Sequence, residues 1–156
     1  MRKATLLLTA TLLATASSQS CGSGFTLVGS ACYLFPDDSL TWQQARNYCR
    51  ALVLPDGKKA SLARVESCSQ LHALTNHITN QGYEIADYWL GGTSALDVTG
   101  AFRWESTGAL VPIGPPFWFP GQPDYAGIER TLSLSKTGLF ADEGESLEQK
   151  FICQIL

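Results

Sequence analysis

Oxygen-bearing side chains gather in one part of the sequence in a pattern that suits a cation. Gln122, Pro123 and Asp124 are consecutive, and the carboxylates of Glu129 and Asp142 follow. Calcium prefers about six to eight oxygen ligands from carboxylates, amide carbonyls and the backbone. An amide, a proline and a carboxylate in a row can direct two oxygens to one side if the peptide before Pro123 is cis. By itself, Gln-Pro-Asp is equally typical of a surface turn.

The segment that carries most of this pattern is too irregular to form helices or strands. Residues 105–130 hold five of the seven prolines and four glycines. A loop of this length inside a compact domain is usually functional or disordered. Trp118 and Phe119 within it favour an ordered loop.

Two helices are predicted before the loop. Thr41 and Gln44 fit a capping box at the start of the first helix, and Ser67 and Gln70 fit one at the start of the second. Helical spacing of apolar residues gives each helix a buried face. These faces comprise Trp42, Ala45, Cys49 and Leu52 in the first helix, and Leu71, Leu74 and Ile78 in the second.

Short strands are predicted around and after the loop. The aromatic-rich runs 88–92 and 102–104 come before it, and residues 131–134 and 150–154 come after it. Helices followed by strands indicate an α+β fold, with a small antiparallel sheet that carries the long loop. We expect one domain over residues 21–156.

Composition excludes several functional classes. The 156 residues are 45% apolar, 10% aromatic and 16% charged, too apolar for a disordered chain and too short for two ordinary domains. The formal charge of −3 excludes a basic nucleic-acid footprint. The sequence contains no Gly-x-Ser-x-Gly, His-Glu-x-x-His or phosphate-binding glycine motif, so we do not expect an enzyme.

Residues 1–20 form a predicted signal peptide. Arg2 and Lys3 give a basic start, and a run of leucine, threonine and alanine follows. This run is too short to anchor the chain across about 30 Å of hydrocarbon, so we expect a secreted protein without a membrane anchor. A buried N-terminal helix is the alternative. The candidate cleavage positions follow Ala16, Ser18 and Ser20.

The mature sequence resembles the C-type lectin-like domain family, through spaced motifs that run in the family's order along nearly all of it. These motifs are Cys32-Tyr33, the helix from Thr41 to Cys49, Trp89-Leu90-Gly91-Gly92, Phe102-Arg103-Trp104, Trp118 to Asp124, and Phe151-Ile152-Cys153. The resemblance implies the family's α+β fold, with two helices, small antiparallel sheets and a long loop that carries the binding site.

The resemblance also implies how the cysteines pair. It implies disulfides Cys21–Cys32 and Cys49–Cys153, which leaves Cys68 over. An odd cysteine in a secreted protein indicates either a buried inert thiol or an intermolecular bond. We expect a homodimer through Cys68, with the buried thiol as the alternative.

The resemblance implies that Gln122, Asp124, Glu129 and Asp142 bind calcium and, with it, carbohydrate. The Gln-Pro-Asp version of the motif is associated with galactose-type sugars. Tyr125 is a candidate for stacking on the sugar, or an ordinary surface tyrosine.

Two departures from the family pattern affect this site. Ala141 stands where the family has an asparagine ligand, which predicts weakened calcium binding; Glu143 is a candidate substitute. Thr131 stands where the family has the first of two loop cysteines, and residues 143–149 contain no second one. We therefore expect a loop that is held less firmly.

We expect a secreted, calcium-dependent, galactose-type lectin that acts in pattern recognition, as part of innate immunity, or in agglutination. The alternative is a C-type lectin-like domain that has lost sugar binding and binds a protein partner. Four tryptophans could serve as sugar platforms, although core packing is the favoured interpretation: Trp42, Trp89, Trp104 and Trp118.

Overall fold

The computed structural model describes residues 21–22, 24–124 and 127–156. The predicted signal peptide (residues 1–20) and the stacking candidate Tyr125 lie outside these described residues. Within them, no helix combines the length and the apolar character that crossing a membrane requires.

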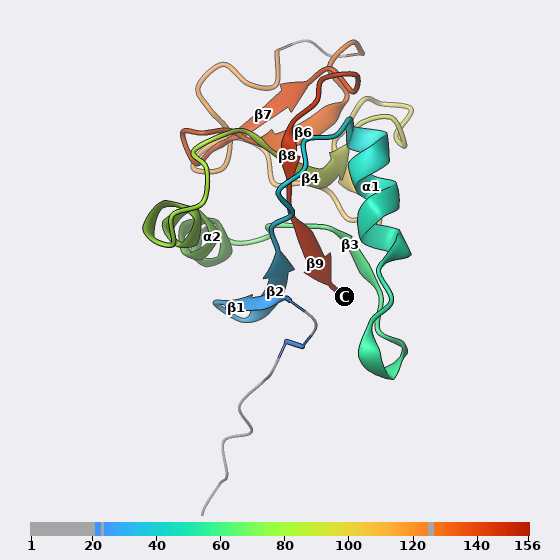
Figure 1. Cartoon of the computed structure of the whole chain (residues 1–156). Coiled ribbons are helices and arrows are strands. Elements are labelled where there is room, and N and C mark those ends of the chain that lie inside the picture. Colours follow the sequence, from blue (N-terminus) through green and yellow to red (C-terminus); the bar gives the residue numbers. More distant parts are fainter. Residues whose placement is uncertain (1–20, 23, 125–126) are drawn as a thin grey trace, which may run out of the picture.

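The two ends of the domain meet in one antiparallel sheet (Figure 1). Tyr33, near the N-terminal end, pairs with Gln154, near the C-terminal end. The order of the strands is β1 (Thr26–Val28), β2 (Ala31–Leu34), β9 (Cys153–Ile155) and β3 (Ala60–Leu62). Disulfides Cys21–Cys32 and Cys49–Cys153 join the pairs that the resemblance implies, and the second links α1 to β9.

A second sheet supports the long loop, which lies above it in the view of Figure 1. Its central strand β4 pairs antiparallel with β5 and β6, and β6 pairs with β7. The strands are β5 (Arg103–Trp104), β4 (Tyr88–Thr93), β6 (Thr131–Leu134) and β7 (Phe140–Glu143), with β8 (Lys150–Phe151) beside β4. The β4–β8 pairing is parallel, so the sheet is not wholly antiparallel as predicted.

Both predicted helices are confirmed, together with their caps. α1 spans Trp42–Ala51 and α2 spans Cys68–Asn80, and a complete capping box closes the start of each. A short 3-10 turn, η1 (Pro55–Gly57), follows α1. The helices lie on opposite sides of the central strands in Figure 1. The fold is therefore the predicted α+β arrangement.

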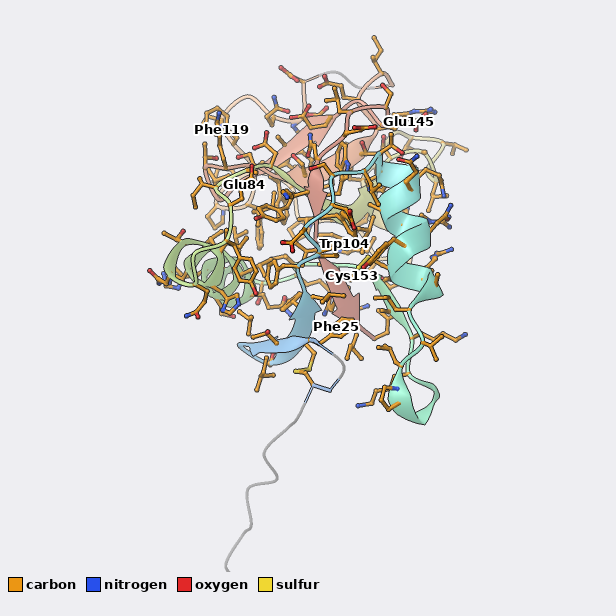
Figure 2. All side chains as sticks on the ribbon, viewed as in Figure 1. Phe25, Glu84, Trp104, Phe119, Glu145 and Cys153 are labelled. Atoms are coloured by element: carbon orange, nitrogen blue, oxygen red, sulfur yellow. A yellow bond between two sulfur atoms is a disulfide. The ribbon has the colours of Figure 1, made fainter. Side chains whose placement is uncertain are left out.

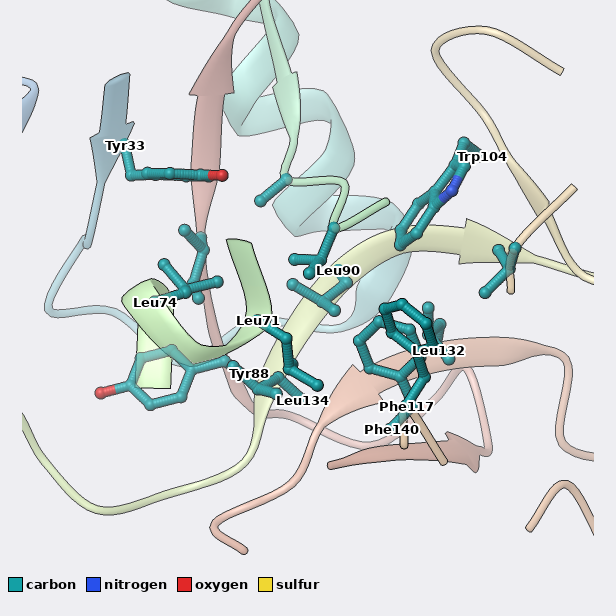
Figure 3. Close-up of a cluster of buried hydrophobic side chains, with 14 of the residues drawn as sticks. Tyr33, Leu71, Leu74, Tyr88, Leu90, Trp104, Phe117, Leu132, Leu134 and Phe140 are labelled. Carbon is teal, nitrogen blue, oxygen red and sulfur yellow. The ribbon is translucent and has the colours of Figure 1, made fainter. Parts of the chain in front are cut away.

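Each helix covers its own hydrophobic core. Trp89 of β4 packs in the core with α1, whereas the next residue, Leu90, packs in the core with α2 (Figure 3). Successive side chains of a strand point to opposite faces, so β4 contributes to both cores. The buried faces are Trp42, Ala45 and Cys49 in α1, and Leu71, Leu74 and Ile78 in α2. Leu52, predicted as the last residue of the first face, is instead the half-buried C-cap of α1.

The four tryptophans belong to the core, as the favoured interpretation predicted. None of them is more than 7% exposed. The indole Nε1 of Trp42 donates to the carbonyl oxygen of Leu90 at 2.8 Å, and that of Trp89 donates to the carbonyl oxygen of Leu40 at 2.9 Å. Since buried indoles need partners, these bonds bind the start of α1 to β4.

Candidate metal centre

Three carboxylates, two from the long loop and one from a strand, lie close together. Asp124 and Glu129 belong to the long loop, and Asp142 belongs to β7; one oxygen from each lies within 4.8 Å of the other two. Calcium binds oxygen at about 2.3–2.6 Å, so two ligands on opposite sides of one ion lie roughly 4.6–5.2 Å apart. The separation therefore fits a single calcium ion.

Asp142 is the fixed member of the three. β7 pairs with β6 so that Asp142 lies opposite Leu132, and only 2% of Asp142 is exposed. Its Oδ1 accepts a hydrogen bond from the backbone amide of Asp124 at 3.2 Å. The strand therefore orients the loop through the same carboxylate that faces the other two acids.

Gln122 lies against the same strand. Its Oε1 accepts a hydrogen bond from the backbone amide of Asp142 at 3.3 Å, and the peptide between Gln122 and Pro123 is cis. A carbonyl oxygen has two lone pairs, so this oxygen can accept that bond and still bind a cation. Gln122 thus contacts the backbone of Asp142, one of the three converging acids, and its role as a ligand stays a prediction.

Negative charge is crowded around the three carboxylates. Burial raises the pKa of Glu129, and the nearby charges of Asp142 and Asp124 raise it further. Burial likewise raises the pKa of Glu143, with the charge of Glu129 as the next cause. Like charges disfavour the ionised form, and a divalent cation between them would reverse that effect.

Ala141, at the position of the family's asparagine ligand, offers the site no side-chain oxygen. Ala141 is buried on β7, where it pairs with Ser133 of β6, and its side chain is a methyl group. Glu143, the candidate substitute, is not among the three acids that converge. The side chains present fit a calcium ion, with fewer protein oxygens than the family motif supplies.

The base of the loop is joined to β7 by hydrogen bonds. Phe119 donates its amide to the carbonyl oxygen of Phe140 at 2.9 Å, and Phe140 donates to that of Phe117 at 2.7 Å. The hydroxyl of Thr131 donates to the carbonyl oxygen of Glu143 at 2.7 Å. Thr131 thus makes a strand-to-strand contact at the position where the family has a loop cysteine.

Cys68 is the first residue of α2, and it is exposed. The alternative of a buried inert thiol is therefore wrong. An exposed thiol is accessible to a second chain, so the intermolecular bond stays a prediction.

Known lectin-family proteins are similar to this chain in sequence. Residues 38–155 match the family model for the lectin C-type domain, a region that contains both helices and all four predicted site residues. Perlucin from Haliotis laevigata is 31% identical over 135 residues, covering 86% of this chain and 77% of perlucin. The galactose-specific lectin nattectin from Thalassophryne nattereri is 25% identical over 139 residues, covering 88% of this chain and 81% of nattectin.

Solved structures show the same fold. The C-type lectin CEL-I from Cucumaria echinata superposes with a TM-score of 0.75 at 22% identity, covering 88% of this chain and 99% of CEL-I.

Proposed function

Because the chain belongs to the C-type lectin domain family, whose members bind carbohydrate, we propose that it binds glycans through a calcium ion held by Asp124, Glu129 and Asp142. The observation that carries this proposal is the approach of one oxygen from each side chain to within 4.8 Å of the other two. Gln122 is the fourth proposed ligand because it contacts the backbone of Asp142.

The same side chains have two roles in this proposal. Calcium, when bound, accepts two neighbouring sugar hydroxyls as further oxygen ligands. Asp124 and Glu129, which are less buried than Asp142, accept hydrogen bonds from those hydroxyls. Hydrogen bonds to charged groups are stronger than those between neutral groups. Ala141 offers no such group, so we expect weaker calcium binding than a complete ligand set gives.

Two observations support a galactose-type preference. The sequence has Gln122 and Asp124 on either side of Pro123, the version of the motif associated with galactose. One relative of similar length is named a galactose-specific lectin. The matched family is a lectin family, in keeping with the prediction that the chain is not an enzyme.

We further propose secretion and clustering. Residues 1–20 have the pattern of a signal peptide, and the two disulfides suit an oxidising compartment. A single sugar site binds weakly, so pairing through the exposed Cys68 would raise avidity in pattern recognition or agglutination. Mass spectrometry of the protein released by expressing cells tests for cleavage after Ala16, Ser18 or Ser20.

A galactose column tests the proposed function directly. The purified domain is loaded in millimolar calcium and eluted with a chelator. We expect retention that the chelator releases, and flow-through for Asp142→Asn. Glu145→Gln, a matched change at an exposed carboxylate, should be retained like the unaltered protein. Flow-through of the unaltered domain on galactose and mannose columns would refute the proposal.

The second candidate function is binding of a protein partner without sugar. Ala141 favours it because it removes a ligand oxygen, and so does Thr131, which replaces a loop cysteine. Retention of a partner from native fluid in the presence of chelator, by Asp142→Asn as well as by the unaltered domain, would favour this function over the first.

A further inference from the structure

An apolar groove of about 410 Å³ adjoins the candidate metal centre. Its wall contains prolines, aromatic rings and a leucine, with no charged side chain. The main lining residues are Pro115, Pro116, Trp118, Phe119, Gln122 and Leu139. An uncharged ligand with an apolar face suits such a wall.

Phe119 is the exposed ring of this wall. It is 44% exposed, whereas Trp118 beside it is only 3% exposed. The backbone of Phe119 is held on both sides, because its amide donates to Phe140 at 2.9 Å and its carbonyl oxygen accepts from the amide of Gln122 at 2.9 Å. Figure 2 places Phe119 at the outer surface of the domain, on the loop side. The backbone that carries the ring is therefore held in place before any ligand arrives.

Gln122 connects the groove to the metal centre. Its residue lines the groove, and its Oε1 contacts the backbone amide of Asp142 at 3.3 Å. The groove and the candidate metal centre therefore adjoin at Gln122.

We propose that the groove holds the second residue of an oligosaccharide whose terminal galactose binds at the metal centre, an inference that rests on the proposed function. Pyranose rings present a face of C–H groups, and such a face packs on an exposed aromatic ring. The groove then gives the domain a preference for galactose linked to a further sugar over free galactose.

Two ligands that share the same terminal sugar separate the groove from the metal centre. Lactose carries a glucose after its galactose, whereas methyl β-galactoside carries only a methyl group. We expect lactose to bind roughly five- to tenfold more tightly, the gain from covering part of one aromatic ring. Calorimetry in millimolar calcium measures both dissociation constants.

Variants of Phe119 test whether the groove causes the tighter binding of lactose. Phe119→Ala should abolish the preference for lactose and leave the affinity for methyl β-galactoside within about twofold. Phe119→Trp should retain the preference because it keeps an aromatic ring. Leu110→Ala, at a side chain that is 60% exposed and outside the groove lining, is the matched control and should change neither affinity.

Saturation-transfer NMR provides a second measurement. Irradiation of aromatic protons should transfer saturation to the glucose ring of lactose in the unaltered domain, and less in Phe119→Ala. Equal affinities for the two ligands, with no transfer to glucose, would overturn the groove proposal and leave the proposed function intact. Calcium-independent behaviour or absence of binding for both ligands would instead overturn the proposed function, and the groove proposal with it.

Discussion

The backbone amide of Asp124 donates a hydrogen bond to Oδ1 of Asp142 at 3.2 Å. Asp124 lies in the long loop and Asp142 lies on β7, so this bond joins the loop part of the candidate site to the strand. The carboxylate of Asp142 therefore has two roles: it holds the loop, and it is a proposed ligand of the cation. Substitutions of Asp142 can separate these roles.

Asp142→Asn tests the metal centre. The amide keeps a carbonyl oxygen for the hydrogen bond from Asp124 and removes one negative charge. We expect calcium affinity to fall by about tenfold or more, since calcium affinity follows ligand charge. Calorimetry measures the loss, and thermal unfolding should no longer shift upward when calcium is added. Unchanged affinity would exclude Asp142 as a ligand, and Glu145→Gln controls for overall charge.

Ala141→Asn tests whether the missing ligand limits calcium affinity. Asparagine restores an amide oxygen at the position where the family has one. We expect calcium to bind about tenfold more tightly, the scale of one hydrogen bond to a charged group. Ala141→Val is the matched control, because it adds bulk to the same buried position without an oxygen. Equal calcium affinity in the two variants would show that this position does not reach the ion.

Cys68→Ser tests the proposed dimer. We expect a dimer band on non-reducing electrophoresis of the unaltered protein, absent after reduction and absent in the variant. Binding to a galactose-coated surface should weaken in the variant, while calcium affinity in solution stays the same, because avidity needs two linked sites. A monomer band alone for the unaltered protein would end the proposal.

The two disulfides should differ in their contributions to stability. Cys49–Cys153 spans 104 residues and Cys21–Cys32 spans 11. Loop-closure entropy predicts a loss of about 5 kcal/mol for Cys49→Ala/Cys153→Ala and about 3 kcal/mol for Cys21→Ala/Cys32→Ala. Urea unfolding measures both, and the reverse order would contradict the entropic explanation.

His77 should make the free energy of unfolding depend on pH. Its ring packs against Phe35 and Tyr83, and its Nε2 is buried without a hydrogen-bond partner among the described residues. This burial lowers the pKa of His77 from 6.5. The end of a helix favours a protonated histidine, whereas burial among apolar groups disfavours it.

The sign follows from proton binding. The unfolded chain, whose histidine titrates near 6.5, binds more protons than the folded chain just below that pH, so stability falls as the pH decreases through this range. We expect His77→Gln to lose less stability than the unaltered protein between pH 7.5 and 5. His72→Gln, at an exposed histidine, should behave like the unaltered protein. Equal losses in all three proteins would contradict this role for His77.

Local signals in the sequence were sufficient to predict both helices and part of the second sheet. The capping pairs beginning at Thr41 and Ser67 act over three residues, so they can be identified without tertiary structure. Residues 131–134 formed the strand β6 with the predicted bounds. By contrast, the strands β1 and β3 were not predicted, because each is only three residues long. A strand is identified from alternating apolar and polar residues only over about four or more residues.

The sequence by itself determined which side chains could bind a cation, because this follows from residue type and order, and its resemblance to the lectin family indicated which ligand is missing. Gln122, Asp124, Glu129 and Asp142 were all predicted from it. Only the tertiary structure decided that three carboxylates meet and that Phe119 forms an exposed wall of a groove that Gln122 also lines. The distance between Asp124 and Asp142 depends on how the loop folds back on β7, and that depends on backbone hydrogen bonds between residues distant in sequence.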